Sequence, residues 1–289
     1  YSTISDITIS AGATTGTSSF TPTDDSIYEG NETGVVAIST VSGGSATEDG
    51  TQSVTITITE NDSSPTITLA TSASSIAENA GSSLTLTATS SIVADEDITV
   101  SISTSGTGTE GTDYSTISDI TISAGDTTGT SSFTPSDDSV YEGNETGIVA
   151  ISGVSGADAA ESGSQSVTIT ITENESSPTV TLATSGTSIA ENSGSTLTLT
   201  ATISQAADED VTVNLGAAGT STNGTDYGSI SSITVSAGAT TGTATFDPTD
   251  DSIYEGNETA IISISSVSGA DAAESGSQSV TITITENDS

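Results

Sequence analysis

The chain has 289 residues, of which 39 are Asp or Glu, a net charge of −39, and no Lys, Arg, His, Cys, Met or Trp. These absences exclude an imidazole base, a thiol nucleophile, a Schiff-base lysine, a disulfide and a zinc site with the usual nitrogen and sulfur ligands. Without basic side chains, neither nucleic acid nor anionic lipid is an expected partner. No apolar run approaches the ~20 residues of a transmembrane helix, so we expect no membrane insertion within this segment, and we expect no enzyme.

A repeat with a period of 113 residues organises the sequence, and its copies start at Tyr1, Tyr114 and Tyr227. Residues 1–62 match residues 114–175 at 51 of 62 positions. Self-similarity at this period indicates an array of whole domains. We place the boundaries at the polar junctions before Pro65 and Pro178. The chain then divides into the C-terminal part of one domain, here the first repeat (residues 1–62), and two complete domains, the middle repeat (63–175) and the last repeat (176–289).

Each complete repeat is predicted to hold about seven short strands. In the middle repeat, apolar and polar residues alternate with many β-branched side chains, which predicts strands over residues 66–72, 83–90, 97–104, 119–125, 129–135, 146–154 and 166–173. In the last of these, Val167, Ile169 and Ile171 are expected to face the core and the intervening threonines the solvent. No segment has the period of a long amphipathic helix. We therefore predict an all-β fold of tandem Ig-like Greek-key sandwiches.

One acidic motif of ten residues occurs in every repeat, as DDSIYEGNET at 24–33, DDSVYEGNET at 137–146 and DDSIYEGNET at 250–259. It places carboxylates at positions 1, 2, 6 and 9, and a glycine at position 7 lets the loop turn. The motif tyrosines are interpreted as packing residues: Tyr28, Tyr141 and Tyr254. The stretches ADEDITV (94–100) and ADEDVTV (207–213) are interpreted instead as a polar edge.

Alternate loops of a Greek-key sandwich cluster at one end, which would gather seven carboxylates of the last repeat: Glu191, Asp226, Asp250, Asp251, Glu255, Glu258 and Asp288. Each of their 21 pairs costs roughly 2–3 kcal/mol at an effective dielectric constant near 20. The sum, about 10 kcal/mol or more after screening, rivals the stability of a whole domain. Either the carboxylates are protonated, the loops stay open, or divalent cations bind. Many hard oxygen ligands suit Ca²⁺ better than Mg²⁺, and backbone carbonyls could complete the shell, as at Ile27, Val140 and Ile253.

The whole chain resembles the Calx-beta domain, an Ig-like Ca²⁺-binding sandwich of sodium/calcium exchangers and many large extracellular proteins. The resemblance lies in the Glu of SIAEN, in GTDY, in the AG(D/A)TTGT turn, in the acidic motif and in the final VTITITEN(D/E). It implies metal ligands at Asp24, Asp25, Glu29, Glu32, Glu60 and Asp62 in the first repeat; at Glu78, Asp113, Asp137, Asp138, Glu142, Glu145, Glu173 and Glu175 in the middle repeat; and at Glu191, Asp226, Asp250, Asp251, Glu255, Glu258, Glu286 and Asp288 in the last.

Two departures from the family pattern bear on the expected number of ions. The family often ends its last strand in three acids, whereas the middle one is here replaced by Asn61, Asn174 or Asn287. The first repeat also lacks the early Glu and the Asp of GTDY. We still expect several Ca²⁺ ions per complete domain, but fewer than a full set of acids would hold.

The function we infer is a calcium-binding structural segment of a long secreted or cell-surface protein, such as an adhesin stalk or an extracellular filament, stiffened by Ca²⁺ at its domains and junctions. Two alternatives remain open. The chain could be a discrete filament subunit whose half-domain is completed by an identical neighbouring chain. It could also be a halophilic acidic spacer without specific metal sites, in which case monovalent salt would substitute for Ca²⁺.

Overall fold

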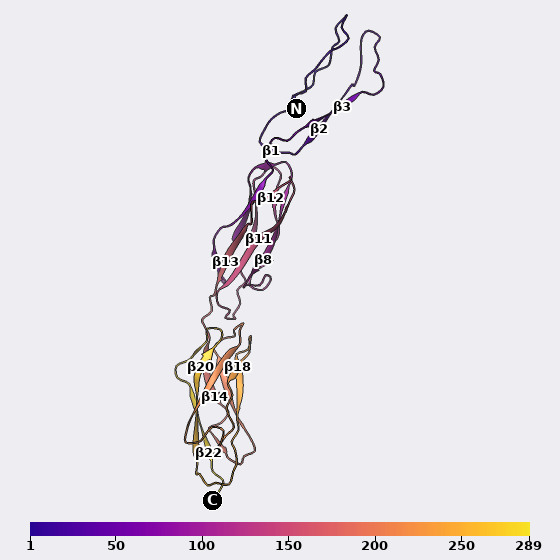
Figure 1. Cartoon of the computed structure of the whole chain (residues 1–289). Helices are drawn as coiled ribbons and strands as arrows, with labels where there is room; N and C mark the ends of the chain where they lie inside the picture. The colour runs from indigo at the N-terminus through magenta and orange to yellow at the C-terminus, as the bar shows by residue number, and fades with distance from the viewer. The chain divides into compact units, whose positions relative to one another are not determined.

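The computed structural model describes every residue from Tyr1 to Ser289, and all of its regular secondary structure is β (Figure 1). The chain forms two compact units. The first comprises Tyr1–Ser74, Ser82–Thr134 and Gly147–Ile169, and the second comprises Ser75–Gly81, Pro135–Thr146 and Thr170–Ser289. The first repeat thus lies in the first unit and the last repeat in the second, whereas the middle repeat contributes to both.

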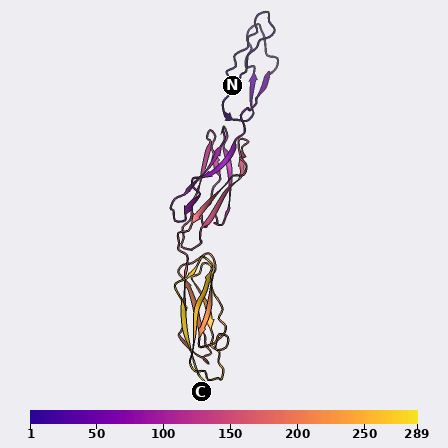
Figure 2. The same cartoon turned by 60° about the vertical axis from the view of Figure 1, so that its left-hand side comes forward.

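The last repeat is a two-sheet sandwich whose strands run along the length of the domain (Figure 2). Its strands are β14 (Thr179–Thr184), β15 (Ser188–Ala190), β16 (Leu197–Ile203), β17 (Val211–Gly219), β18 (Ile233–Val235), β19 (Thr241–Phe246), β20 (Glu258–Ser268), β21 (Ala273–Glu274) and β22 (Ser279–Thr285). One sheet has the order β19-β16-β14-β21 and the other the order β15-β22-β20-β17-β18. The crossovers between non-consecutive strands make it a Greek-key sandwich, as the sequence predicts.

The middle repeat has the same strand order, with sheets β10-β6-β4-β12 and β5-β13-β11-β8-β9. Its strands are β4 (Thr66–Thr71), β5 (Ser75–Ala77), β6 (Leu84–Ser90), β7 (Val93–Ala94), β8 (Ile98–Gly106), β9 (Ile120–Ile122), β10 (Thr128–Phe133), β11 (Glu145–Ser155), β12 (Ala160–Glu161) and β13 (Ser166–Thr172). All seven predicted strands are present. The additional strands β5, β7 and β12 have two or three residues each, too few to show an alternating pattern.

The core of each sandwich consists of the apolar members of the alternating strands. In β13, Ile169 and Ile171 are buried while the flanking threonines are at least partly exposed, which confirms the inward face expected from the sequence. In the last repeat, the Tyr227 and Phe246 rings stack with their centroids 4.7 Å apart, and both residues are almost completely buried. Such a stacked pair stabilises the core beyond the area that it buries.

One glycine of the last repeat allows two strands to approach closely. A Cβ atom built on Gly242 in β19 would lie 2.3 Å from the backbone oxygen of Thr234 in β18. Real Cβ atoms do not approach a carbonyl oxygen so closely, so only glycine fits at this position.

The first repeat contributes β1 (Ile27–Tyr28), β2 (Glu32–Ala37) and β3 (Ser53–Ile58), and β2 and β3 pair as an antiparallel hairpin. Ile7 and Ile9 are 58% and 59% exposed in this repeat. Their counterparts in the middle repeat, Ile120 and Ile122, are 0% and 1% exposed. The strands that cover the counterparts come from the half of the domain that the first repeat lacks in this chain.

Candidate metal centre

Parallel pairing of the strands places two of the predicted ligands of the last repeat side by side. The strands β15 and β22 run parallel, with Ala190 opposite Thr285. Glu191 and Glu286 are the next residues along these strands, and the Glu191 N–H donates to the Thr285 carbonyl oxygen at 3.1 Å. Both side chains therefore emerge at the same end of the sandwich, which we call the tip of the domain.

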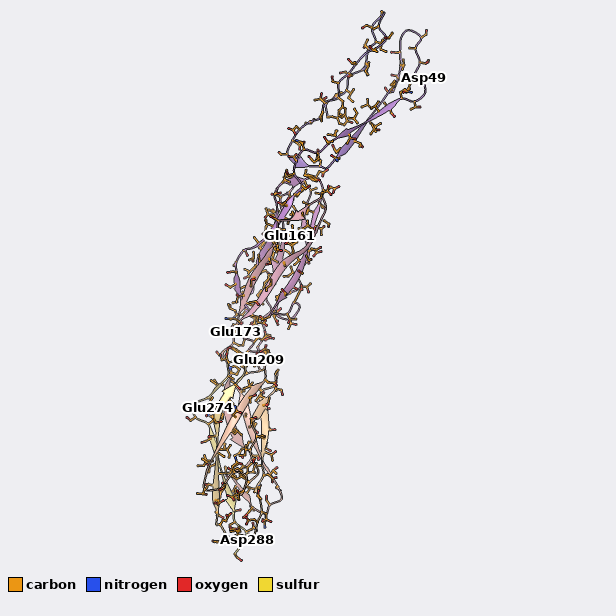
Figure 3. All side chains as sticks on the ribbon, in the orientation of Figure 1. Asp49, Glu161, Glu173, Glu209, Glu274 and Asp288 are labelled. Carbon is orange, nitrogen blue, oxygen red and sulfur yellow. The ribbon has the colours of Figure 1, made fainter.

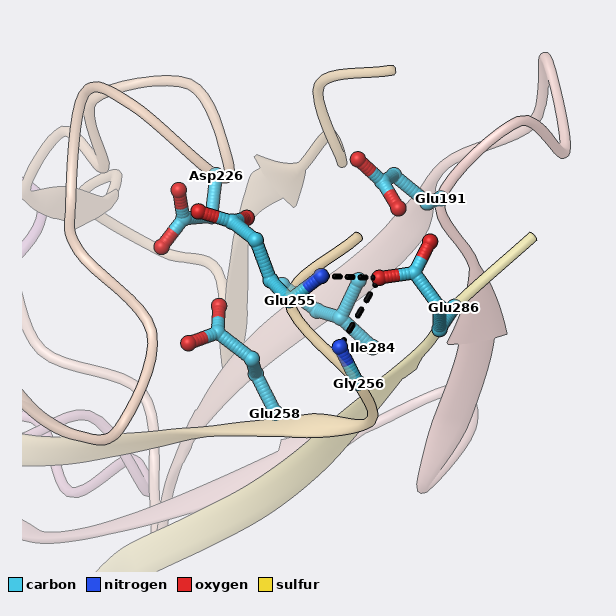
Figure 4. A pocket seen from close by; sticks show the side chains of 7 residues that line it. All are labelled: Glu191, Asp226, Glu255, Gly256, Glu258, Ile284 and Glu286. Carbon is cyan, nitrogen blue, oxygen red and sulfur yellow. Dashed lines mark hydrogen bonds between the residues drawn. The ribbon is translucent and has the colours of Figure 1, made fainter. Parts of the chain in front are cut away.

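Glu286 shapes the acidic motif of the last repeat around its own carboxylate (Figure 4). Its Oε2 accepts hydrogen bonds from the backbone N–H of Glu255 at 2.6 Å and of Gly256 at 2.9 Å. Its Oε1 accepts from the Asp288 N–H at 2.8 Å. Gly256 turns the loop at φ 74°, which is the role expected of this glycine from the sequence.

Three more carboxylates converge beside this loop. Oxygen atoms of Asp226, Glu255 and Glu258 all lie within 4.8 Å of one another. Asp226 arrives on the GTDY loop and is held there by the Thr222 N–H, which donates to its Oδ2 at 2.5 Å. Figure 4 shows these three carboxylates and those of Glu191 and Glu286 around one pocket.

The surroundings of the tip carboxylates raise some of their pKa values and lower another. Burial, together with the neighbouring Asp226 carboxyl, raises the pKa of Glu258 to about 7. Burial also raises the pKa of Glu191 and of Glu255. Hydrogen bonds from the N–H groups of Asp288 and Glu255 lower the pKa of Glu286 instead. Glu286 therefore keeps its negative charge, whereas burial disfavours the charged forms of Glu191, Glu255 and Glu258.

The middle repeat carries a comparable group at the ends of β5 and β13. Oxygen atoms of Glu78, Glu173 and Glu175 lie within 4.8 Å of one another. Glu78 is only 6% exposed, and burial raises its pKa to about 7. Glu173 accepts from the Glu142 and Gly143 N–H groups at 2.7 and 2.9 Å, as Glu286 does in the last repeat.

Two buried oxygen atoms at these tips have no hydrogen-bond partner, Oε2 of Glu175 and Oδ2 of Asp288. An unpartnered buried carboxylate oxygen is costly, and a cation would satisfy it. The candidate ligand atoms at both tips are carboxylate oxygen atoms. The sequence contains no Lys, Arg or His that could pair with them. This donor set fits a hard divalent cation, and its size and irregular arrangement suit Ca²⁺.

Four other predicted ligands have contacts or exposures of their own. In the last repeat, the Asp251 N–H donates to Oε1 of Glu191 at 3.4 Å, whereas Asp250 is exposed. In the middle repeat, the Asp138 N–H donates to Oε1 of Glu78 at 3.2 Å. Asp113 is 9% exposed, and its Oδ2 accepts from the Thr109 N–H at 2.6 Å.

The first repeat also gathers most of its predicted ligands around a pocket, without an early Glu or the Asp of GTDY. Its pocket is lined by Asp25, Ile27, Glu29, Glu32, Glu60 and Asp62, among other residues. Asp24 is not among the lining residues, and its Oδ1 accepts from the Asn61 side chain at 3.0 Å. For Val140 and Ile253, the N–H groups donate to Asp138 and Asp251, and a ligand role for their carbonyl oxygens stays a prediction.

One asparagine of the acidic motif positions the site in every repeat, and it was not identified from the sequence. The Asn257 Oδ1 accepts from the Glu286 N–H at 3.0 Å, and Asn144 and Asn31 do the same for Glu173 and Glu60. Each of these hydrogen bonds joins the acidic motif to the residue that follows the last strand of the same repeat. The recurrence of the asparagines at one position of the acidic motif was the signal in the sequence that could have identified them.

Comparison with solved structures gives several matches. The chain is similar to CBD12 from CALX1.2, with 13% identity, a TM-score of 0.34 and coverage of 76% of this chain and 100% of that one. It is similar to the calcium binding domain CBD12 of CALX1.1, with 12% identity, a TM-score of 0.30 and coverage of 73% and 96%. It is also similar to the adhesin InvE of Yersinia pseudotuberculosis, with 11% identity, a TM-score of 0.36 and coverage of 76% and 60%.

The comparison of sequences is more decisive. No curated protein matches the chain, and the structure contains no helix that is long and apolar enough to cross a membrane. The profile of the Calx-beta domain matches three successive stretches, residues 2–62, 60–175 and 173–288. These stretches cover almost the whole chain. The chain therefore belongs to the Calx-beta domain family, with three tandem matches to the domain.

Proposed function

We propose that this chain is a calcium-binding structural segment of a long extracellular or cell-surface protein, with several Ca²⁺ ions at the tip of each complete domain. Calcium neutralises the tip carboxylates, fixes the acidic motif and stiffens the domains and their junctions. The chain itself catalyses no reaction. Its proposed partners are identical neighbouring chains in a fibre, and its proposed setting is an adhesin stalk or a filament.

One observation carries this proposal: the tip acids converge without any cationic side chain, and buried oxygen atoms of Glu175 and Asp288 lack a partner. A carboxylate cluster that folds against its own repulsion needs a counter-charge. Protonation supplies one for the acids whose pKa reaches about 7, Glu78 and Glu258. The N–H groups of Asp288 and Glu255 lower the pKa of Glu286, which therefore keeps its negative charge at neutral pH, so a divalent cation is the better counter-charge for the tip as a whole.

Thermal unfolding in different salts tests the proposal. We expect CaCl₂ at millimolar concentration to raise the unfolding midpoint strongly above its value in EGTA, and MgCl₂ or equivalent NaCl to raise it much less. Asp226→Asn keeps an oxygen acceptor for the Thr222 N–H but removes one tip charge, and it should lose part of the calcium effect. The matched control is Asp126→Ala, because Asp126 is exposed and the last repeat has Ala239 at the same position.

The alternative of a halophilic acidic spacer has an observation in its favour, since many acids lie away from the tips. Glu209 and Glu274 lie at the end of the last domain opposite Asp288 (Figure 3). They accept hydrogen bonds from the backbone N–H groups of Ala270 and Gln278. Under this alternative, NaCl would stabilise the protein as well as CaCl₂ does at equal ionic strength, and Asp126→Ala would have the same effect as Asp226→Asn.

A discrete filament subunit completed by a neighbouring chain stays a prediction. The exposed Ile7 and Ile9 of the first repeat are the surface that added strands would cover. Mass spectrometry of the intact polypeptide distinguishes a discrete species of 28.2 kDa from a much larger protein.

A further inference from the structure

The tyrosine of the acidic motif has two different environments in the three repeats. Tyr28 and Tyr141 are each 8% exposed, whereas Tyr254 is 69% exposed. Ile253, which precedes Tyr254, is 61% exposed. The motif sequences around Tyr28 and Tyr254 are identical, so the difference arises from what lies against each segment.

Within the first unit, the Ile27–Tyr28 segment is seated on the middle repeat. It pairs in parallel with Val93–Ala94, which places Tyr28 opposite Ala94. The Asp95 N–H donates to the Tyr28 carbonyl oxygen at 3.2 Å. The Tyr28 hydroxyl donates to Oδ2 of Asp158 at 2.8 Å. The segment thus adds a short strand to the next repeat and anchors it with one aromatic side chain.

Within the second unit, Tyr141 makes the same set of contacts with the last repeat. It bridges in parallel to Ala207, and its N–H donates to the Ala206 carbonyl oxygen at 2.9 Å. The Asp208 N–H donates to the Tyr141 carbonyl oxygen at 3.2 Å, and the Tyr141 hydroxyl donates to Asp271 at 3.0 Å. Tyr141 also belongs to the hydrophobic core cluster of the last repeat.

The receiving surface, which we call the socket, combines a small residue with a carboxylate. In the last repeat these are Ala207, which is 1% exposed, and Asp271, which lies in a turn at φ 47°. The small side chain leaves room for the tyrosine ring, and the carboxylate accepts the phenolic hydrogen bond, so that the apolar and the polar end of Tyr141 are both satisfied.

The Tyr254 segment already has the local conformation of the two seated copies. The Ile253 N–H donates to Oδ1 of Asp251 at 2.7 Å, as Val140 does to Asp138 at 2.7 Å and Ile27 to Asp25 at 2.9 Å. The hydrogen bonds from the Glu255 and Gly256 N–H groups to Glu286 hold its other side. A segment fixed in its bound conformation loses little conformational entropy on docking.

We propose that Ile253–Tyr254 is a docking strand whose partner is a further domain of this same repeat type, presented with an open socket. The strand pairs with the residues equivalent to Ala206–Asp208 of that domain, and the Tyr254 hydroxyl donates to its equivalent of Asp271. The partner is fixed by continuity with the two seated copies, which show the same strand on the same socket. The docking contacts use the backbone of the strand and the Tyr254 side chain, as in the two seated copies, and not the carboxylates that flank the strand.

Chemical nitration of tyrosine tests the proposal. The full chain is compared with an extended chain in which a second copy of residues 177–289 follows Ser289, which restores the Ser-Ser-Pro junction found at 176–178. The added copy carries Tyr254→Phe, so that the peptide of the original Tyr254 is unique in mass spectrometry. Tyr1, 61% exposed, is the reactive reference, and Tyr28 and Tyr141 are the protected references.

We expect Tyr254 to react as fast as Tyr1 in the original chain and at least about tenfold more slowly in the extended chain, since a docked population of nine-tenths slows the reaction by that factor. An extended chain with Ala207→Glu and Asp271→Ala in the added copy should restore the reactivity, and continued protection of Tyr227 confirms that this copy is folded. The experiment is run with CaCl₂ and with EGTA. Tyr254 that stays as reactive as Tyr1 in both, or that is protected equally with the altered socket, overturns the proposal.

Discussion

At the scale of single residues, the carboxyl groups of Asp226 and Glu258 show how acids at the metal centre are neutralised. Both carboxylates lie in the group whose oxygen atoms are within 4.8 Å of one another. Burial and the proximity of Asp226 raise the pKa of Glu258 to about 7, so the pair tends to share a proton at neutral pH when no cation is bound. A divalent ion replaces that proton. Calcium binding should therefore release protons from the protein.

Replacing Glu258 with glutamine distinguishes the repulsion between its charge and the neighbouring acids from its role as a calcium ligand. In EGTA, Glu258→Gln should raise the unfolding midpoint, because it removes one of several like charges. In CaCl₂ it should lower the calcium affinity of the last domain by about tenfold or more, because a ligand is lost. Differential scanning calorimetry and calorimetric titration measure the two effects, and Asp126→Ala should change neither. A variant that binds calcium as tightly as the parent would show that Glu258 is not a ligand.

The pH dependence of stability follows from the raised pKa values of Glu78 and Glu258. Both are about 7 in the folded protein, above the ordinary 4.5 that applies when the chain is unfolded. The folded state then binds protons more tightly, so in EGTA the unfolding free energy should rise as the pH falls from about 7 to about 4.5.

Acids with lowered pKa values act in a different range of pH. The stabilisation by Glu60 and Glu286 is present above pH 4.5 and is lost only below that value. Chemical denaturation at a series of pH values measures the slope. Stability that falls steadily between pH 7 and pH 5 in EGTA would contradict the assigned shifts. In CaCl₂ the trend should reverse, because protons then compete with the ion.

At the scale of elements, strand positions could be predicted from the sequence, whereas the short pieces that complete the sheets could not. The alternation in 166–173 specifies both β13 and its inward face, because one side of the sheet is buried. The strands β5, β7, β12 and β21 have only two or three residues each. Their pairing is determined by neighbouring strands rather than by their own residues.

The close approach of β18 and β19 can be tested with two glycines of the last domain. Gly242→Ala should destabilise the domain by about 1–3 kcal/mol, because its Cβ would overlap the Thr234 oxygen. Gly216→Ala in β17 should be tolerated, since its nearest neighbour would be Ser263 Oγ at 3.6 Å. Urea unfolding of both variants measures the difference. Equal stabilities would show that β18 and β19 do not approach as closely as described.

At the scale of the whole molecule, the contacts that the tyrosines of the first two acidic motifs make with the following repeat were not predictable from the sequence. The prediction that the motif tyrosines pack is wrong for Tyr254, which is 69% exposed, and is confirmed for Tyr28 and Tyr141, which are buried. The residues that receive them lie 66 positions further along the chain, at Ala94 and Ala207. These stretches were interpreted as a polar edge because their carboxylates dominate the composition, while the contact uses backbone groups and one alanine. The tip acids, in contrast, could be predicted because they recur and have no compensating charge.

Substitution of Tyr141 should measure the contribution of this contact to the second unit. Tyr141→Phe removes the hydroxyl bonded to Asp271 and should cost about 1 kcal/mol of unfolding free energy. Tyr141→Ala should cost about 3–5 kcal/mol, as expected for loss of a buried aromatic side chain. Tyr254→Ala is the matched control and should leave stability unchanged, because Tyr254 is 69% exposed. If the Tyr141 and Tyr254 variants behave alike, Tyr141 is not seated as described.

The most direct test of calcium binding is a crystal structure of the chain grown in CaCl₂, with anomalous scattering used to locate the ions. We predict strong peaks at the tip of the last domain, within bonding distance of oxygen atoms of Asp226, Glu255 and Glu258, and further peaks in the middle repeat beside Glu78, Glu173 and Glu175. Tips without peaks, with these side chains turned away into solvent, would contradict the account.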